Sequence, residues 1–433
     1  MTEQAFVIRG DAVYSVSPQE LASRPQSYLL VAEGRIAGLA AELPPQWQTL
    51  PLYDYGAALL LPGMTDLHLH APQFSFRGLG MDLPLLPWLE RYTFPEEARY
   101  AEAAHAEQAY RAFAAELQRG FLTRAVVFAT IHGAASLRLA QLLEQSGLIA
   151  FVGRVSMDRC ALPALAEGPD ALAAEQAWLQ QMQQAGLQRV RPILTPRFVP
   201  SCSPQLLAGL GALAAESGLP VQSHLSESRD EVALVRELYP QSAFYGAVYD
   251  RFGLFGQTPT VMAHCVYSDE NEQELIQRRG VFVAHCPQSN LNLVSGAAPV
   301  REMLRRGLRI GLGSDIAGGA HSSPLRGIQD AIAVSKLRAA LLEDSSLTLS
   351  FAEAFYLATC GGGAFFGQVG SLQPGYAADI LVLDDRRSRR PGMDLEERLQ
   401  RAVYLLDERD LLAKYIAGRR AGPPASGGRR RRA

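Results

Sequence analysis

Two histidines close the apolar stretch LLLPGMTDLHLH, which runs from Leu59 to His70. Residues i and i+2 of a β-strand point to the same face, so His68 and His70 are expected to project side by side from the end of a strand. Two imidazoles held in this way suit a metal ion. A single H-x-H pair also arises by chance on a protein surface, and the rest of the chain has to distinguish the two interpretations.

Seven more short apolar runs follow along the chain. Amphipathic segments with helical periodicity separate them, such as residues 100–120 and 203–218. Short buried strands that alternate with helices predict a parallel sheet, and eight of them in about 250 residues predict an α/β fold of the (β/α)8 or TIM barrel type. The eight runs are LLLPGMTDLHLH, TRAVVFAT, IAFVGRVSMD, VRPILTPRF, LPVQSHLSE, PTVMAHC, GVFVAHC and LRIGLGSD.

Six of the eight runs end on a reactive or hydrogen-bonding side chain. In a barrel the carboxyl ends of all strands open on one face, where active sites lie. These side chains are therefore expected to converge on one mouth, although they are far apart in sequence. Chance would scatter the eight histidines of the chain over helices and loops, whereas five of them fall at predicted strand ends. The side chains are His68, His70, Arg197, His224, His264, His285 and Asp315.

Four of these side chains form a mixed nitrogen and oxygen donor set that suits Zn²⁺, with Fe²⁺ as the alternative. A bound divalent ion lowers the pKa of a water molecule and supplies hydroxide at neutral pH. His264 could orient that hydroxide, and Glu227 in HLSE could carry its protons. Glu227 alone would equally fit a surface carboxylate or the first turn of a helix. The four candidate ligands are His68, His70, His224 and Asp315.

Both ends of the chain predict a second, smaller domain. The stretches AFVIRGDAVYSV and YLLVAEGRIAGLA have the pattern of strands, the second around an EGRI turn, and GYAADILVLD predicts a late strand of the same kind. We therefore expect a barrel of residues 61–370 inserted into a small composite β-sandwich from residues 1–60 and 371–420. Residues 421–433 are expected to form a disordered basic tail.

The composition is that of an ordinary globular protein. Of the 433 residues 48% are hydrophobic and 20% charged, with a net charge of -3, so nothing favours nucleic acid as a partner. The amino terminus lacks the pattern of a signal peptide, and no apolar run reaches the roughly 18 residues of a membrane span. The five cysteines show no C-x-x-C pair. We expect a cytoplasmic protein with reduced thiols and no membrane partner.

Several longer motifs carry a more specific signal. Taken together they resemble the guanine deaminase family of the amidohydrolase superfamily, over residues 61–319 and again at GYAADILVLD. The stretches HLHAPQ, DLPLLPWLERYTFP and TPRF are specific to that family, whereas H-x-H, SHLSE and GSD are shared by many deaminases and chlorohydrolases. The motifs are PGMTDLHLHAPQFSFRGLGMDLPLLPWLERYTFPEE, TPRFVPSCS, QSHLSESRDEV, AHCVYSDEN, AHCPQSNLNL and GLGSDIAGG.

The resemblance implies a zinc-dependent hydrolase that deaminates guanine to xanthine and ammonia in purine catabolism or salvage. It implies zinc binding by the four candidate ligands, with Glu227 and His264 handling protons and hydroxide and Asp315 also able to accept a proton. His285 and Asn290 are expected to brace the mouth. Barrels with two metal ions bridge them with a carbamylated lysine at the fourth strand. This chain has no lysine between His70 and Lys336, so we expect one ion per chain.

The resemblance also implies how the purine is held. Gln73 in HAPQ and Arg197 with Phe198 in TPRF would bind it, together with His224 and Glu227. The chemistry agrees, because the carbonyl oxygen at position 6 of guanine accepts from an arginine, whereas the amino group of adenine would not. Phe198 offers an apolar face to the ring. The resemblance further implies a homodimer.

Other functions stay open at this point. A related mononuclear amidohydrolase could act on another purine, a pterin or a triazine, and Gln73 and Arg197 are the residues that would separate these substrates. A catalytically inactive homologue could act as a scaffold, although the predicted ligands and proton carriers are all present. The other class of zinc deaminase, with an H-x-E…P-C-x-x-C signature, is excluded because the chain has no such cysteine pair.

Overall fold

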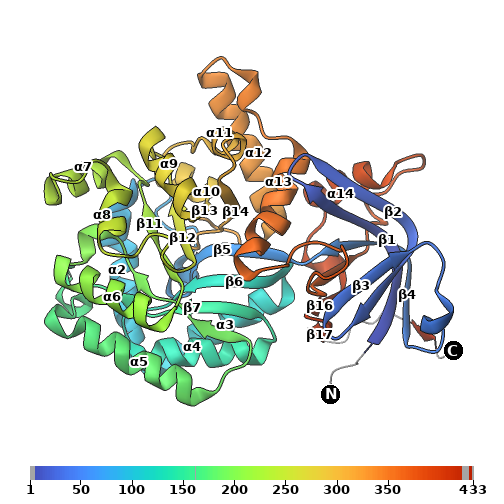
Figure 1. The fold of residues 1–433 in the computed structure, drawn as a ribbon, viewed down its shortest axis with the longest axis horizontal. Helices are drawn as coiled ribbons and strands as arrows, with labels where there is room; N and C mark the ends of the chain where they lie inside the picture. Colours follow the sequence, from blue (N-terminus) through green and yellow to red (C-terminus); the bar gives the residue numbers. More distant parts are fainter. Residues whose placement is uncertain (1–4, 161, 422–428, 432–433) are drawn as a thin grey trace.

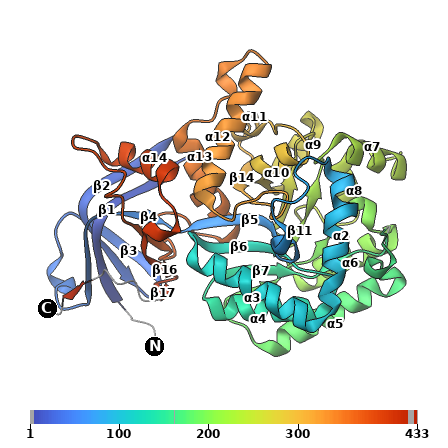
Figure 2. The same cartoon turned by 180° about the vertical axis from the view of Figure 1, so that it is seen from behind.

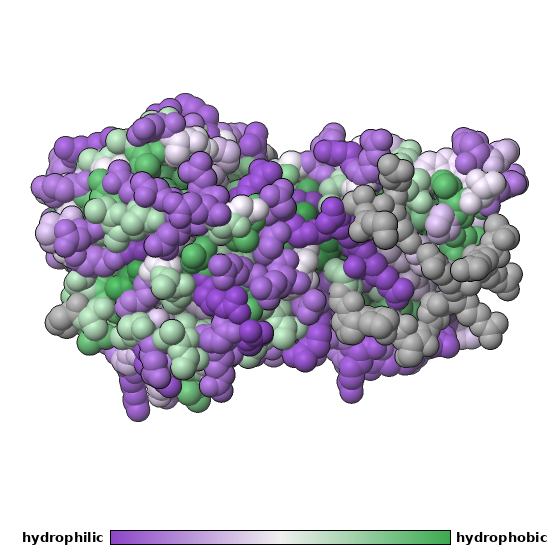
Figure 3. Space-filling model, turned by 90° about the horizontal axis from the view of Figure 1, so that it is seen from below, coloured by the Kyte–Doolittle hydropathy of each residue, from purple (hydrophilic) through white to green (hydrophobic). Residues whose placement is uncertain are grey.

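The structure is a computed structural model that describes residues 5–160, 162–421 and 429–431. A barrel surrounded by helices stands beside a smaller sheet built from both ends of the chain (Figure 1). Among the described residues no helix is long and apolar enough to cross a membrane. The face in Figure 3 is mostly hydrophilic, with hydrophobic residues in separate patches.

The barrel contains all eight predicted strands. They form two four-stranded parallel sheets, in the orders β5-β6-β7-β9 and β11-β12-β13-β14. A parallel bridge between Leu194 and Val221 joins the sheets on one side, and Asp315 N donates to His68 O at 2.8 Å on the other. The predicted barrel is therefore confirmed. The strands are β5 (Met64–His70), β6 (Leu122–Phe128), β7 (Ile149–Gly153), β9 (Val190–Pro192), β11 (Val221–Leu225), β12 (Thr260–His264), β13 (Phe282–His285) and β14 (Arg309–Leu312), with the short pair β8 (Val155–Ser156) and β10 (Thr195–Pro196).

The helices cover the outside of the barrel and bury one face each. In α3 the side chains of Tyr110, Phe113 and Leu117 are buried at helical spacing. The segment 203–218 forms α6 between a Ser203 cap, whose Oγ accepts from Leu206 N, and Gly218 at φ 68°. Both predicted helical segments are confirmed.

The helices are α1 (Leu85–Trp88), α2 (Phe94–Ala98), α3 (Ala103–Arg119), α4 (Gly133–Ser146), α5 (Ala171–Ala185), α6 (Pro204–Ser217), α7 (Arg229–Leu238), α8 (Tyr245–Arg251), α9 (Glu270–Arg279), α10 (Pro287–Asn292), α11 (Val300–Arg305), α12 (Pro324–Leu341), α13 (Phe351–Tyr356) and α14 (Leu395–Leu405). A π-helical turn, η3 (Leu89–Thr93), joins α1 to α2. The segment around α2 runs alongside the barrel (Figure 2).

The second part is a sheet that both ends of the chain build. Its order is β17-β16-β15-β4-β1-β2-β3, with β18 on β4. The predicted EGRI turn joins β2 to β3, where Glu33 and Gly34 have φ of 51° and 76°. Its strands are β1 (Ala5–Ser17), β2 (Glu20–Ala32), β3 (Arg35–Ala40), β4 (Leu52–Pro62), β15 (Ile380–Leu383), β16 (Leu411–Ile416), β17 (Arg419–Ala421) and β18 (Arg429–Arg431).

The predicted small composite domain is present, with its strands connected into one sheet. This sheet bends where β1 shifts register between Gly10 and Ala12. Side chains of its two halves share one core, in which Phe6 stacks on Tyr415 with ring centroids 5.5 Å apart. The sheet therefore packs on itself in the manner of a sandwich.

The apolar run from Leu59 to His70 is two strands and not one. Strand β4 ends in the small sheet, and β5 begins in the barrel one residue later, at Met64. Gly63 sits at the crossing, where a Cβ would lie 2.4 Å from Thr123 Oγ1. The apolar pattern is continuous because both strands are buried, so hydropathy alone could not reveal the break.

The domain limits at 60/61 and 370/371 stay a prediction. Most of the predicted disordered tail, residues 422–428 and 432–433, lies outside the described residues. Residues 429–431 form β18, which pairs antiparallel with β4 between Leu52 and Asp54.

Candidate metal centre and active site

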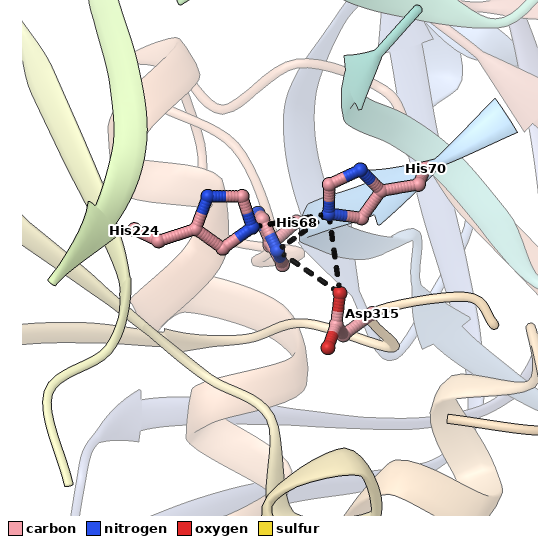
Figure 4. A group of neighbouring side chains, drawn as sticks. All are labelled: His68, His70, His224 and Asp315. Carbon is pink, nitrogen blue, oxygen red and sulfur yellow. Dashed lines mark hydrogen bonds and ion pairs between the residues drawn. The ribbon is translucent and has the colours of Figure 1, made fainter. Parts of the chain in front are cut away.

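Four side chains converge at the carboxyl end of the barrel strands, as Figure 4 shows. His70 Nε2 lies 3.2 Å from both His68 Nε2 and His224 Nε2, and Asp315 Oδ1 lies 3.1 Å and 3.3 Å from the Nε2 atoms of His68 and His70. One ligand atom from each of the four residues lies within 4.8 Å of the others. Three nitrogens and one oxygen around one point form a donor set suited to a transition metal.

Strand β5 and the loop after β14 hold this cluster together. The register of β5 against β6 shifts between Asp66 and Leu69, at the point where the strand reaches the mouth. Asp66 Oδ1 accepts hydrogen bonds of 3.0 Å from His68 N and Ser314 N, which ties the loop to the strand end. Burial raises the pKa of Asp66 to about 7. Asp66 therefore braces His68 and the loop that carries Asp315, without belonging to the cluster itself.

His68 and His224 are held in the neutral form of imidazole that binds a metal. His224 Nδ1 donates to the backbone oxygen of Arg197 at 2.6 Å, so its Nε2 carries the free lone pair. Burial lowers the pKa of His68 to about 3 and that of His224 well below its usual value, which keeps both rings neutral. Burial acts to raise the pKa of Asp315, but hydrogen bonds from His68 and His70 hold it well below the usual value. Neutral rings at His68 and His224 beside the ionised carboxylate of Asp315 fit a divalent cation.

Two further titratable side chains, His264 and Glu227, lie beside this cluster. His264 Nε2 lies 3.6 Å from Glu227 Oε2 and 3.9 Å from Asp315 Oδ2, and has no hydrogen-bond partner among the described residues. Its Nδ1 donates to Asn290 Oδ1 at 2.9 Å, which fixes the ring. Burial acts to lower the pKa of His264, but the charges of Glu227 and Asp315 raise it overall.

Glu227 is buried at the start of the segment that leads into α7. Burial raises the pKa of its carboxyl to about 7, so that it can hold and release a proton near neutral pH. Ser295 Oγ donates to its Oε1 at 3.1 Å, and Oε2 is the oxygen that faces His264. This is the arrangement that a proton carrier requires.

Backbone strain is also present at these strand ends. Ser226, His264, Cys265 and Asp315 have φ between 47° and 75°, a region that residues other than glycine rarely adopt. Such strain persists where the surrounding structure fixes it, and it is enriched at functional sites.

A small pocket opens beside the cluster. Its polar lining comes from three members of the cluster, all but His68, and from Gln73, Arg197, Glu227 and His264. Its apolar walls are Leu85, Trp88, Leu89, Phe198 and Leu293. A flat ring with polar edges fits walls of this kind.

Comparison with known proteins agrees with this geometry. Residues 59–420 match the model of the amidohydrolase family. The chain belongs to the amidohydrolase family. It is 39% identical over 381 residues to a guanine deaminase from Mus musculus, and 38% identical over 375 residues to one from Dictyostelium discoideum, each alignment covering 84% of this chain and 83% of the relative.

A solved structure of guanine deaminase from C. acetobutylicum, with bound guanine in the active site, is 41% identical to this amidohydrolase. The two superpose with a TM-score of 0.93 over 96% of this chain and 100% of the other. The similarity thus extends over both the barrel and the small sheet.

The amidohydrolase pocket also brings Gln73 and Arg197 onto one carboxylate. Glu97 of α2 accepts a hydrogen bond of 3.0 Å from Nε2 of Gln73. It also accepts from both terminal nitrogens of Arg197, and the bond from Nη2 is 3.1 Å long. The amide oxygen of Gln73 accepts from Ala317 N at 3.1 Å. Phe198 is half-buried and lines the same pocket.

The structure adds residues that sequence reasoning missed. Ser289 Oγ donates to Asp315 Oδ2 at 2.5 Å, and Glu97 holds Gln73 and Arg197. The pattern TFPEE gave no signal to separate Glu97 from its neighbour Glu96. Asn290 Oδ1 accepts from His264 Nδ1, whereas His285 is buried and its Nδ1 has no hydrogen-bond partner among the described residues.

Proposed function

We propose that this amidohydrolase catalyses the hydrolytic deamination of guanine to xanthine and ammonia. One observation carries the proposal. A cluster of three histidines and one aspartate lies beside a pocket that contains a fixed arginine, and the chain is similar to guanine deaminases over most of its length. A cluster alone would fit many hydrolytic reactions of this family. The arginine and glutamine at its side narrow the choice to a ring with a carbonyl at its edge.

We propose Zn²⁺, at one ion per chain, as the metal that His68, His70, His224 and Asp315 hold. A bound zinc ion acidifies water and so supplies the nucleophile for hydrolysis. The donor set supports zinc because neutral imidazole nitrogens and one carboxylate oxygen are its usual ligands. One ion is proposed because Arg197, which cannot be carbamylated, stands at the end of the fourth strand.

Glu227, His264 and Asp315 are proposed to move and hold protons. Hydrolytic deamination requires a proton to pass from water to the ring and to the departing amine. The carboxyl of Glu227 has a pKa raised to about 7, so it can accept a proton and then donate it. His264 lies within 3.6 Å of Glu227 Oε2, where its charge steadies the ionised carboxylate. Asp315 is proposed as the second group, besides Glu227, that can accept a proton.

The proposed substrate contacts follow from the polarity of guanine. Arg197 would donate to the oxygen at position 6, and Gln73 would offer both a donor and an acceptor to the ring edge. The amine that leaves from carbon 2 would then face Glu227 and His224. Phe198 would cover a ring face.

The cellular setting of the enzyme is proposed from the family resemblance. We propose a cytoplasmic homodimer that acts in purine catabolism or salvage, without nucleic acid or membrane partners. Sedimentation of the purified protein tests the oligomeric state, because a monomer at micromolar concentration would contradict the dimer.

Incubation of the purified protein with a panel of purines and pterins tests the reaction. Ammonia release is followed, and the product is identified by mass. Guanine should be converted to xanthine at the highest kcat/KM of the panel. Preferred turnover of a pterin or of an aminopurine without a carbonyl would contradict the assignment.

Elemental analysis of the same preparation tests the metal. The expected result is close to one transition-metal ion per chain, mostly zinc. Two tightly held ions per chain would contradict the single site. Removal of the metal with a chelator should abolish turnover, and added zinc should restore it.

A further inference from the structure

Gln73 and Arg197 share one buried carboxylate, that of Glu97. Only 2% of Glu97 is exposed, and its two oxygens accept three hydrogen bonds from the side chains of Gln73 and Arg197. Both partners line the pocket, whereas Glu97 stands behind them. We propose that Glu97 is the positioning residue that sets the substrate specificity of this site. This inference rests on the proposed guanine deaminase function.

The carboxylate decides which way Gln73 faces. The amide of glutamine has nearly the same shape when it is flipped, but the flip exchanges its donor and its acceptor. An ionised carboxylate only accepts, so Nε2 of Gln73 must point to Glu97, and Ala317 N only donates, so Oε1 must point to Ala317. The second N–H of Nε2 and the second lone pair of Oε1 stay available for a substrate, and the two existing hydrogen bonds fix their directions. Glu97 therefore fixes the hydrogen-bonding pattern that Gln73 presents.

The same carboxylate holds the guanidinium of Arg197. The pair uses two of the five N–H donors of the arginine and leaves the others in a fixed plane. The side chains of Arg197 and Glu97 are only 4% and 3% exposed, so each charge depends on the other for compensation. Phe94, in the same helix as Glu97, lies 5.1 Å from the guanidinium carbon. Helix α2 thus holds the guanidinium of Arg197 through the charge of Glu97 and the ring of Phe94.

The adjacent glutamate provides a matched control. Glu96 follows Pro95 in the same helix and points to a different group of side chains, accepting from Ser75 Oγ at 2.7 Å, Arg99 at 2.7 Å and His105 at 2.9 Å. Consecutive residues of a helix do not face the same neighbour. Loss of the carboxylate at position 96 therefore changes the charge of α2 without touching Gln73 or Arg197.

The test compares Glu97→Gln with Glu96→Gln. In Glu97→Gln the new amide can both donate and accept, so Gln73 is free to flip and Arg197 loses its counter-charge. We expect retained zinc, a raised KM for guanine and a fall of about 100-fold in kcat/KM, the scale of a misplaced substrate group. The preference for guanine over 2,6-diaminopurine should fall about 10-fold or more, since a misaligned donor discriminates less. Glu96→Gln should keep the KM and the preference of the parent.

A double-mutant cycle separates positioning from a general loss of structure. The variant Glu97→Gln/Arg197→Met removes both charges of the pair and stays electrically balanced, so it is expected to fold even if Glu97→Gln alone does not. Because Glu97 acts partly through Arg197 and partly through Gln73, Glu97→Gln should cost less activity in the Arg197→Met background than in the parent, so the double variant should lose less than the product of the two single losses. Losses that multiply in the double variant would overturn the proposal. Parent-like KM and parent-like preference in Glu97→Gln would also overturn it.

Failure of the proposed function can be told apart from failure of the positioning role of Glu97. A parent protein that leaves guanine intact but deaminates another ring would overturn guanine deamination. The same cycle measured on that ring would then test Glu97 directly. A crystal structure of Glu97→Gln adds a readout independent of turnover: Gln73 and Arg197 in unchanged positions would contradict the positioning role.

Discussion

The two ends of the barrel both bury charged groups, but they differ in how completely those groups are paired. At the amino end, where the small sheet packs, Arg124 Nε donates to Asp379 Oδ2 at 2.7 Å, and Asp379 is fully buried. Lys414 Nζ donates to three backbone carbonyls between α3 and the start of β6, at 2.8 to 3.1 Å. Every donor of that ammonium group has an acceptor.

The carboxyl end leaves its polar groups incompletely matched. Three imidazole nitrogens and a carboxylate oxygen crowd together, and His264 Nε2 has no hydrogen-bond partner in the described part of the chain. A bound cation would stabilise such a group of lone pairs. The comparison shows that burial of charge alone does not indicate a site, whereas convergence of acceptors does.

The largest expected loss at the carboxyl end follows from Glu227→Gln. The amide keeps the size of the side chain but cannot carry a proton, so kcat should fall by about 10²- to 10⁴-fold. Metal content and thermal unfolding should stay those of the parent. Glu237→Gln, at an exposed position of α7, is the control and should keep full turnover. A near-parent rate in Glu227→Gln would move the proton transfer to Asp315 or His264.

At the amino end the expected loss is in stability and not in rate. Arg124→Met leaves the buried Asp379 without its ion-pair partner and should lower the free energy of unfolding by about 3–5 kcal/mol. The folded variant should keep the kcat/KM of the parent, because Arg124 lies near the start of β6 and away from the mouth. Denaturant unfolding and steady-state kinetics measure the two effects.

The exposed pair of Arg386 and Asp384 gives the matched control for that substitution. The side chain of Arg386 is 82% exposed. Arg386→Met should lower the free energy of unfolding far less than Arg124→Met does, because solvent screens an exposed ion pair. Equal losses in the two variants would show that burial does not distinguish these ion pairs.

A smaller effect at the amino end depends on pH. Burial lowers the pKa of Lys414 from 10.5 to about 7, so the folded protein releases this proton before the unfolded chain does. Between those pH values the unfolded chain binds more protons, and the stability rises with pH. From pH 7 to pH 9 the gain is about 2 kcal/mol for this one group. The difference in unfolding free energy between the parent and Lys414→Met, measured at both pH values, isolates it; a pH-independent difference would contradict the assignment.

Much of the fold was predictable from sequence because it depends on local patterns. Each barrel strand is a short apolar run, and the barrel rule places the polar ends of those runs at one mouth. The four residues His68, His70, His224 and Asp315 converge as expected for that reason. The break at Gly63 was not predictable, because both strands around it are equally apolar.

The support behind the pocket could not be predicted either. Glu97 and Ser289 act through contacts with residues far away in sequence, 100 positions for the pair with Arg197 and 26 for the pair with Asp315. Their own neighbourhoods carry no distinctive spacing. Only the packing of α2 and α10 against the mouth reveals which polar residue faces inward.

The preference between guanine and 2,6-diaminopurine tests the central claim most directly. Both purines carry the same leaving amine at carbon 2, but diaminopurine has an amino group where guanine has its carbonyl oxygen. A buried arginine that meets this amino group leaves its own hydrogen bonds unmade. The account predicts a kcat/KM for guanine roughly 10⁴-fold higher in the parent protein, and a much smaller ratio in Arg197→Met. Equal values for the two purines in the parent protein would contradict the assignment of Arg197, and with it the case for guanine.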